Sequence, residues 1–241
     1  MPTRDFFSAD SPHDQELQDL KPSKLHYVLF YKPYGVLSQF TGAAGQRTLG
    51  DFGPFPRDVY PVGRLDADSE GVLLLTNDNE LKHRLLHPRY GHRRTYLVQV
   101  ERRPSDEALS RIREGVIVEG RRTQPAEVEL LRQEPALPPR SRPIRFRKSV
   151  PTSWLRITLT EGRNRQVRKM TASVGHPTLR IVRISIGPFS ISGLGVGESR
   201  ELAQGEMVRI ARLLETSRRT SRFRKSAQTP PSSRTTPRAN L

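Results

Sequence analysis

The stretch from Tyr60 to Thr76 constrains this chain most, because two apolar runs flank a short polar loop there. The run from Val72 to Leu75 has four consecutive apolar residues, which indicates a strand buried on both faces. The loop before it contains Asp66 and Asp68 in a segment rich in Asp, Ser and Gly, which favours a turn. The pattern fits a plain turn with capping carboxylates and a functional loop on a rigid core equally well.

The charge of the chain indicates a polyanionic partner. Its 241 residues include 41 Lys and Arg against 25 Asp and Glu, a net charge of +16. The seven basic residues after Glu215 supply less than half of this excess, so the folded part is basic as well. Nucleic acid is the first partner that such a balance predicts, and an anionic membrane surface the second.

The two ends of the chain are polar, and cysteine is absent. The lack of cysteine excludes disulfides, thiolate metal ligands and a Cys nucleophile. The acidic N-terminal segment has no apolar core, so it does not resemble a signal peptide. We expect a cytoplasmic monomer with a disordered leader at 1–23, one domain at 24–215 and a disordered basic tail at 216–241.

The apolar pattern predicts a domain of class α+β. Strands and helices are mixed without steady alternation, which favours a mixed, mostly antiparallel sheet flanked by helices. Asn77 or Asp78 is expected to cap one helix and Ser105 another. The expected strands are 25–31, 72–75, 95–100, 116–118, 126–131, 154–160 and 179–186, and the expected helices are 80–86, 105–115, 164–174 and 205–214.

Arg165, Arg168 and Lys169 fall within little more than one turn at the start of an expected helix. Cations at a helix N-terminus oppose the helix dipole, so the cluster is costly unless it faces carboxylates or phosphates. The alternative is a solvated basic face. The basic, proline-rich loop at 134–151 has the same two interpretations, an arm along an RNA backbone or a solvated insertion.

Other chemistries have weaker signals. His83 and His87 have the spacing of two zinc ligands on a helix, but Arg84 stands where the metalloprotease pattern needs Glu. Gly193-x-Gly195 lacks the strand and helix that a dinucleotide loop requires, and no Walker-type phosphate loop is present. The sequence therefore predicts neither a metal nor a cofactor.

The segment Gly63 to Gly71, Gly-Arg-Leu-Asp-x-Asp-Ser-Glu-Gly, resembles the signature of the small-subunit-type rRNA pseudouridine synthases. The Thr-Asn-Asp after the apolar run and the Lys-Pro-Tyr-Gly that begins at Lys32 are similar as well. The resemblance implies the pseudouridine synthase fold, with a catalytic cleft between two sub-domains. It also implies that Asp66 is the catalytic residue.

The resemblance implies roles for further residues. Arg168 matches the base that pairs with the catalytic carboxylate, and such a pair favours the charged form of Asp66. Tyr96 matches the tyrosine that packs on the target base. Arg64 would contact RNA around the extruded nucleotide, although pairing with Asp68 or Glu70 is its plain alternative. The remaining basic residues expected to hold RNA are Arg163, Arg165, Lys169 and Arg180.

The resemblance covers about 25–214 and departs from the family pattern in places. We expect no S4-type RNA-binding module, which many relatives carry, because only about 24 residues precede the domain in this sequence. That feature and the insertion ending in Arg-Lys-Ser-Val-Pro-Thr-Ser-Trp-Leu are similar to a branch that modifies a single uridine in 23S rRNA. Glu101 is followed by two arginines where relatives have Glu-Gly, and Val72 replaces the commoner Leu.

The expected function is therefore isomerisation of a uridine to pseudouridine in 23S rRNA, free or in a pre-50S particle, without a cofactor. Asp66 would act as a nucleophile on the base or the sugar, or as a base on the sugar. One alternative is a non-catalytic RNA-binding or ribosome-assembly protein. Another is an RNA methyltransferase, which would need a Gly-rich cofactor loop after a first strand.

Overall fold

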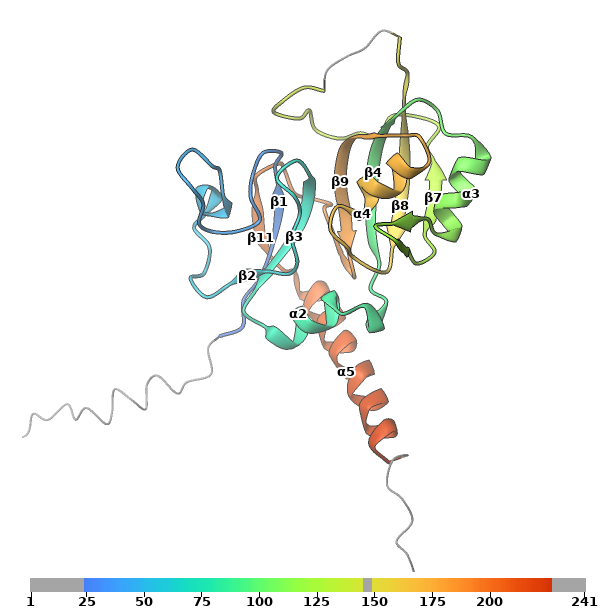
Figure 1. Ribbon diagram of the computed structural model, residues 1–241. Coiled ribbons are helices and arrows are strands. Elements are labelled where there is room, and N and C mark those ends of the chain that lie inside the picture. The colour runs from blue at the N-terminus through green and yellow to red at the C-terminus, as the bar shows by residue number, and fades with distance from the viewer. Residues whose placement is uncertain (1–23, 145–148, 227–241) are drawn as a thin grey trace, which may run out of the picture.

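The computed structural model describes residues 24–144 and 149–226, with side chains up to residue 215. Two halves lie side by side and share one sheet (Figure 1). The strands of the first half are β1 (Tyr27–Lys32), β2 (Tyr60–Pro61), β3 (Glu70–Thr76) and β11 (Ser199–Glu201). Those of the second half are β4 (Arg94–Glu101), β7 (Glu127–Leu130), β8 (Thr152–Leu159), β9 (Thr178–Ile186) and β10 (Phe189–Ser190).

The sheet has the order β11-β1-β3-β9-β4-β8-β7, with β2 paired to β3 and β10 to β9. The halves meet where β3 runs parallel to β9, through the pairs Glu70 with Val182 and Gly71 with Arg183. The other pairings in this sheet are antiparallel. The predicted mixed, mostly antiparallel sheet is confirmed. A separate hairpin joins β5 (Ile117–Val118) to β6 (Arg121–Arg122).

The first half is built on β3, whose seven residues are all buried, including the predicted run from Val72 to Leu75. Val72 and Leu74 pack on one side against α2 (Asn79–Leu86) and α5 (Gln204–Ser226). Leu73 and Leu75 pack on the other side against a group that includes four Phe rings and the short helix η1 (Leu49–Phe52). This continuous burial makes β3 a rigid support for the loop that precedes it.

The second half forms its own core from β4, β7, β8 and β9 with the helices α3 (Asp106–Glu114) and α4 (Gln166–Ser173). The predicted helix caps are present. The Asp78 carboxylate accepts from the Leu81 N–H at 2.9 Å, and the Ser105 hydroxyl accepts from the Ala108 N–H at 3.3 Å. Figure 1 shows α3 on the outer flank, whereas α4 lies near the junction with the first half.

The last helix is longer than expected. It was predicted to end at Leu214, but α5 continues to Ser226, so residues 216–226 of the expected disordered tail are helical. This segment contains neither Gly nor Pro, so nothing in its sequence stops the helix. The expected leader and the rest of the tail lie outside the described residues. Over the described part of the chain, no helix has the length and apolar character needed to cross a membrane.

We expect Gly71→Ala to destabilise the fold, because an added methyl group would lie 2.2 Å from the Arg183 carbonyl oxygen and Gly71 has a φ of +119°. Overpacking of this kind lowers the free energy of unfolding by about 3 kcal/mol or more. Gly205→Ala in α5 is the control, since its methyl group meets no atom within 4 Å. Urea unfolding measures both variants, and equal stabilities would contradict the close approach of β3 and β9.

Candidate active site

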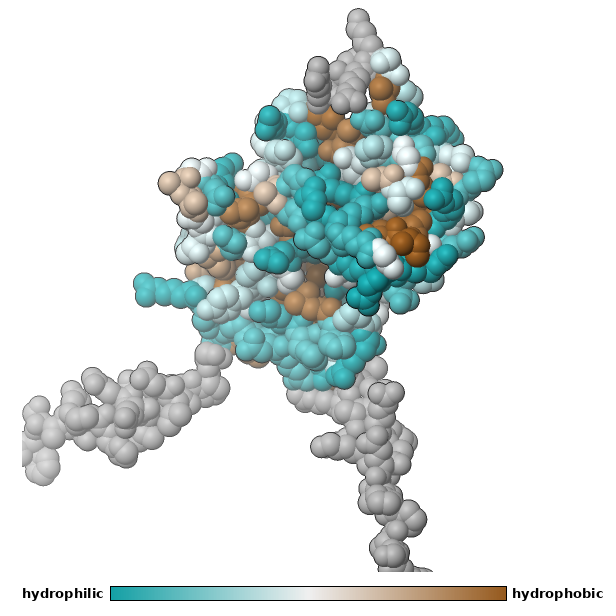
Figure 2. All heavy atoms as spheres, in the orientation of Figure 1, coloured by the Kyte–Doolittle hydropathy of each residue, from teal (hydrophilic) through white to brown (hydrophobic). Residues whose placement is uncertain are grey.

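A polar cleft of about 650 Å³ lies between the two halves. Hydrophilic side chains spread over this part of the surface (Figure 2). The cleft contains the predicted site residues except Lys169 and Arg180, and it confirms the expected cleft between two sub-domains. Its lining includes Ser38, Arg64, Asp66, Tyr96, Arg163, Arg165 and Arg168.

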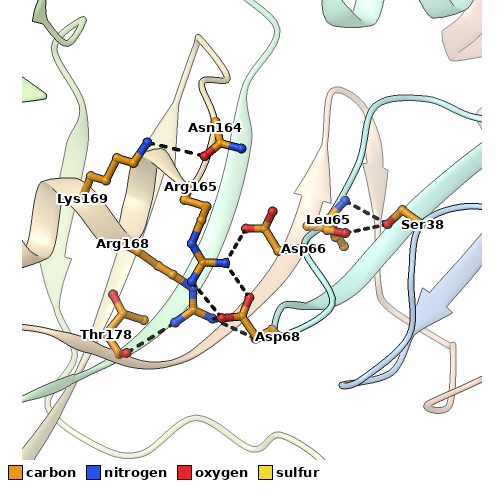
Figure 3. Close-up of polar contacts among 9 residues, drawn as sticks. All are labelled: Ser38, Leu65, Asp66, Asp68, Asn164, Arg165, Arg168, Lys169 and Thr178. Carbon is orange, nitrogen blue, oxygen red and sulfur yellow. Dashed lines mark hydrogen bonds and ion pairs between the residues drawn. The ribbon is translucent and has the colours of Figure 1, made fainter. Parts of the chain in front are cut away.

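The loop that carries Asp66 is held on both sides by the segment after β1. The buried Ser38 hydroxyl donates to the Leu65 carbonyl oxygen at 2.7 Å and accepts from the Leu65 N–H at 3.0 Å (Figure 3). The Gly35 N–H donates to the Ala67 carbonyl oxygen at 2.7 Å. The backbone on each side of Asp66 is therefore fixed, and its carboxylate starts from a defined position.

The Asp66 carboxylate is partly exposed, and its ion-pair partner is Arg165 at 3.4 Å. The resemblance assigns this role to Arg168, whose charge also interacts with that of Asp66, and its role as the partner stays a prediction. Arg168 contacts the neighbouring carboxylate, with its Nη2 3.3 Å from the Asp68 Oδ2. The guanidinium groups and carboxylates lie together in Figure 3, at the point where the loop faces α4.

Asp68 anchors both arginines. Arg165 donates two hydrogen bonds to its carboxylate, at 3.0 and 2.9 Å, and Arg168 donates to its carbonyl oxygen at 2.8 Å. Partial burial alone would raise the pKa of the Asp68 carboxyl, but hydrogen bonding by Arg165 and the charges of both arginines lower it. Asp68 is therefore ionised at neutral pH, and it fixes the guanidinium group that also contacts Asp66.

Arg165 owes its position to an unusual backbone conformation. It is the residue before α4, with φ 50° and ψ 32° in the left-handed region, and its side chain does not cap the helix. A residue with a Cβ adopts this conformation at a cost, which its surroundings must offset. The helix therefore begins at Gln166 rather than at the predicted Asn164, and the Arg165 side chain extends across the cleft to the Asp66 loop.

Arg168 joins three elements from a partly buried position. Besides its contacts with Asp68, it donates to the Thr178 carbonyl oxygen at 3.3 Å, which links α4 to the start of β9. Burial lowers the pKa of Arg168, while the charges of Asp68 and Asp66 raise it again. Because both carboxylates offset the cost of burial, Arg168 belongs electrostatically to the same cluster as Asp66.

Tyr96 lies on β4 and is half-buried in the wall of the cleft. The register of β4 against β9 shifts between Thr95 and Tyr96, so that Tyr96 pairs with Arg183. Arg183 is buried and donates to the Val72 carbonyl oxygen at 2.9 Å. Burial lowers the pKa of Arg183, and its interaction with the Tyr96 phenol opposes that shift. The stacking of Tyr96 on a base stays a prediction.

The other basic residues predicted to bind RNA differ in how freely they reach the surface. Arg64 is exposed at the rim of the cleft. Arg163 pairs with Glu161 at 3.1 Å and also donates to two backbone carbonyls of the β5–β6 hairpin. Lys169 lies 2.6 Å from the exposed carboxylate of Glu119. Arg163 is therefore bound within the protein, whereas Arg64 is available to a ligand.

Arg180 is buried, and the prediction that it binds RNA is wrong for this structure. It donates two hydrogen bonds of 2.8 Å to the carboxylate of Glu70, which is also buried. A third bond of 2.8 Å reaches the Pro138 carbonyl oxygen. A buried arginine needs such a partner, and removing either charge would leave the other uncompensated. Arg180 therefore ties β9 to β3.

Lys32 is a buried cation that the sequence did not single out. Its Nζ donates to the carbonyl oxygens of Val36 at 2.6 Å and Pro33 at 3.0 Å. Burial lowers its pKa to about 8, and the charges of Glu70, Asp66 and Asp68 oppose that shift. Its position at the end of an apolar strand was the one sequence feature that could have indicated its burial. Lys32 fixes the turn that positions Gly35 and Ser38.

The structure bears on two further sequence patterns, the His83 and His87 pair and the basic loop at 134–151. The described residues contain no group of three His, Cys, Asp or Glu side chains that could hold a metal ion, so the His83 and His87 pair gains no third ligand. The Arg140 guanidinium lies 4.3 Å from the Tyr34 ring, and Pro138 contacts Arg180. The described part of the basic loop therefore packs on both halves, and residues 145–148 lie outside the described chain.

The polar cleft thus brings together a carboxylate on a rigid loop, arginines of α4 and the residue before it, and a tyrosine of β4. The family model for RNA pseudouridylate synthase matches residues 26–173. The chain belongs to this family and is an RNA pseudouridine synthase. The predicted family and fold are therefore confirmed.

The similar proteins include enzymes named for the large ribosomal subunit. A ribosomal large subunit pseudouridine synthase E of Xanthomonas axonopodis pathovar citri is 53% identical, over 69% of this chain and 88% of its own. One of Vibrio vulnificus is 46% identical, over 79% and 81%. A crystal structure of a pseudouridylate synthase has a TM-score of 0.64 at 26% identity, over 78% of this chain and 74% of its own. The predicted resemblance to a large-subunit branch is confirmed.

We expect Ser38→Ala to lower turnover, because it leaves the buried N–H and carbonyl groups of Leu65 without their partner. The free energy of unfolding should fall by about 1–3 kcal/mol. Pseudouridine formation should slow by about 10- to 100-fold, since small displacements of catalytic groups have such effects. Ser38→Thr keeps the hydroxyl and should recover activity, and Ser173→Ala on α4 is the control. An unchanged rate in Ser38→Ala would show that the Leu65 bonds do not position Asp66.

The lowered pKa of Asp68 predicts an acid-dependent contribution to stability. A carboxyl whose pKa is lower in the folded state stabilises the fold above its ordinary value of 3.8, and this contribution is lost as pH falls further. Asp68→Asn should therefore be less stable than wild type at pH 7, and the difference should shrink below about pH 4. Urea unfolding between pH 3 and 7 measures it, and a difference independent of pH would contradict the charge pairing.

Proposed function

We propose that the chain converts a uridine of 23S rRNA to pseudouridine in the cytoplasm, with Asp66 as the catalytic carboxylate. The observation that carries the proposal is the position of Asp66, on a clamped loop inside the cleft and within 3.4 Å of Arg165. The relatives named for the large ribosomal subunit support the choice of RNA.

The substrate uridine reaches Asp66 by leaving its helix. The reacting atoms of a stacked base are inaccessible, and enzymes that act on bases extrude the nucleotide into a pocket. The cleft between the halves is the place for the extruded uridine. Tyr96 forms one wall of it, and a phenol ring can stack on uracil while its hydroxyl hydrogen-bonds.

The proposed reaction exchanges one bond of the nucleotide for another. The bond between N1 of uracil and C1′ of the ribose breaks, the base turns, and C5 bonds to C1′. The proton on C5 leaves and N1 gains one, so atoms and electrons balance within one nucleotide and no cofactor is needed. Asp66 acts on the base or the sugar as a nucleophile, or on the sugar as a base, and these routes share its ionised form.

In this scheme the guanidinium of Arg165 holds the Asp66 carboxylate in place at 3.4 Å. Arg64 contacts the RNA beside the extruded nucleotide. Lys169 is paired with the exposed Glu119, and surface pairs are weak enough to exchange for a phosphate. Binding should therefore weaken steeply as salt rises, as it does when cations on a protein replace the counterions of RNA.

The competing function is a non-catalytic RNA-binding or ribosome-assembly protein on the same fold, which would not use Asp66. The family assignment decides against the RNA methyltransferase alternative. Within the proposed function, a monomer acts on free 23S rRNA or on a pre-50S particle.

The test is to map pseudouridine with wild-type protein and Asp66→Asn in parallel. Carbodiimide labelling followed by reverse transcription marks each pseudouridine in 23S rRNA transcripts and in ribosomal particles from a deletion strain. Wild type should produce one new stop, and Asp66→Asn should produce none because the variant lacks the charged oxygen. Asp106→Asn, at an exposed position on α3, is the control and should match wild type.

The outcomes separate the two functions. A stop with wild type and none with Asp66→Asn supports the isomerase. An equal stop with both proteins refutes the role of Asp66. No stop on transcripts and particles, together with full complementation of the deletion strain by Asp66→Asn, would establish the non-catalytic alternative.

A further inference from the structure

Four aromatic rings gather at the surface where α2 leads into β4. We call His83, His87, Tyr90 and His92 the ring cluster. The ring centres of His83 and His87 are 5.3 Å apart, and Tyr90 lies 6.1 Å from His83 and 6.0 Å from His87. His92 lies 6.2 Å from Tyr90 with nearly parallel ring planes, 27° apart. Both His83 and His87 are exposed, whereas the other two rings are half-buried.

The local fold holds these rings in place. His83 lies one helical turn before His87, which is the residue after α2 and the cap of the short helix η2 (Pro88–Tyr90). The His87 Nδ1 accepts from the Arg89 N–H at 3.2 Å. Gly91 then reverses the chain with a left-handed φ of 59° and brings His92 back beside Tyr90. The cluster is therefore arranged before any ligand arrives.

The ring cluster is surrounded by arginines. The guanidinium of Arg89 lies 4.5 Å from the centre of the Tyr90 ring and also bonds its hydroxyl, and that of Arg84 lies 5.9 Å away. Two carboxylates contact arginines here, Glu80 with Arg84 and Glu127 with the exposed Arg93. Arg89 lies on the surface beside exposed rings, which is the combination that binds a nucleic acid strand through stacking and phosphate contacts.

The cluster adjoins the cleft at two points. Leu86 at the end of α2 packs against Gly63, the neighbour of Arg64 at the cleft rim. Arg94 follows the cluster, donates to the Leu85 carbonyl oxygen at 2.9 Å and lies beneath Gly162, a cleft residue. Figure 1 shows α2 and the turn into β4 at the lower edge of the sheet, beneath the junction of the halves.

We propose that the ring cluster is a stacking subsite for one or two unpaired bases of the RNA strand that flanks the extruded uridine, with Arg89 on the adjoining phosphate. This inference rests on the proposed function. A metal ion fits the cluster less well, since no group of three His, Cys, Asp or Glu among the described residues, His92 included, is placed to hold one. The rings are also not part of the hydrophobic core, because His83 and His87 are exposed.

The test measures RNA binding and turnover separately. Tyr90→Ala and His87→Ala should each raise KM for the rRNA substrate by about 5- to 150-fold, the effect of losing one stacked base. They should raise Kd equally when the same RNA is bound to Asp66→Asn protein. The kcat at saturating RNA should stay within about twofold of wild type, because the cluster does not contact the reacting atoms. Tyr90→Phe keeps the ring and should bind like wild type.

The phosphate contact has its own readout and a matched control. Arg89→Gln should lower the slope of log Kd against log salt by about one, and Arg111→Gln, an exposed arginine on the outer helix α3, should leave Kd unchanged. Because Tyr90 is half-buried, thermal unfolding checks that its variants fold, and the exposed His87 provides a variant that does not depend on packing.

The outcomes distinguish this inference from the proposed function. Absence of pseudouridine formation by wild type on both transcripts and particles refutes the function itself. Turnover by wild type with unchanged KM and Kd in the ring variants overturns the subsite alone. Where wild type modifies naked RNA as well as ribosomal particles, an effect of the ring variants confined to particles also overturns the subsite, because the cluster would then contact a ribosomal protein.

Discussion

The parallel pairing of β3 with β9 is the contact on which the active site depends. Parallel strands start at the same end of a sheet, so the segments that lead into them lie side by side. The Asp66 loop leads into β3, and α4 leads into β9. The pairing therefore places the loop beside α4, and Gly71 permits it because its missing side chain leaves room for the backbone of Arg183.

The electrostatics of the cleft follow from that geometry. Cations at the start of α4 oppose the helix dipole, and burial adds to the cost for Arg168. Asp66 and Asp68 offset both effects from the other half of the molecule. The same charges hold the halves together across the cleft, as the buried pair of Arg180 with Glu70 does beneath it. The ion pairs of the cleft and the buried pair thus lie at one interface.

Local structure was predictable from the sequence, whereas contacts between residues far apart in the chain were not. Ser105 predicted the start of its helix, because an N-cap residue bonds only to neighbours within a few residues. The burial of Arg180 depends on Glu70, 110 residues away, and no local pattern shows that pairing. The family resemblance placed Asp66 in the cleft. It did not point to Arg165 as the ion-pair partner of Asp66. The left-handed backbone that turns Arg165 toward Asp66 cannot be read from residue spacing.

The two carboxylates of the loop, Asp66 and Asp68, contact the same arginine in different ways. Asp68 takes two hydrogen bonds from Arg165, near 3 Å, and so fixes the guanidinium, whereas Asp66 has a single contact with that group at 3.4 Å. A carboxylate that accepts two hydrogen bonds from one arginine is stabilised, which makes it a poorer nucleophile or base. The second carboxylate, at the edge of the same cation, has oxygens that are less engaged in hydrogen bonds. This asymmetry suits Asp66 to the proposed attack on uridine and gives Asp68 the role of anchor.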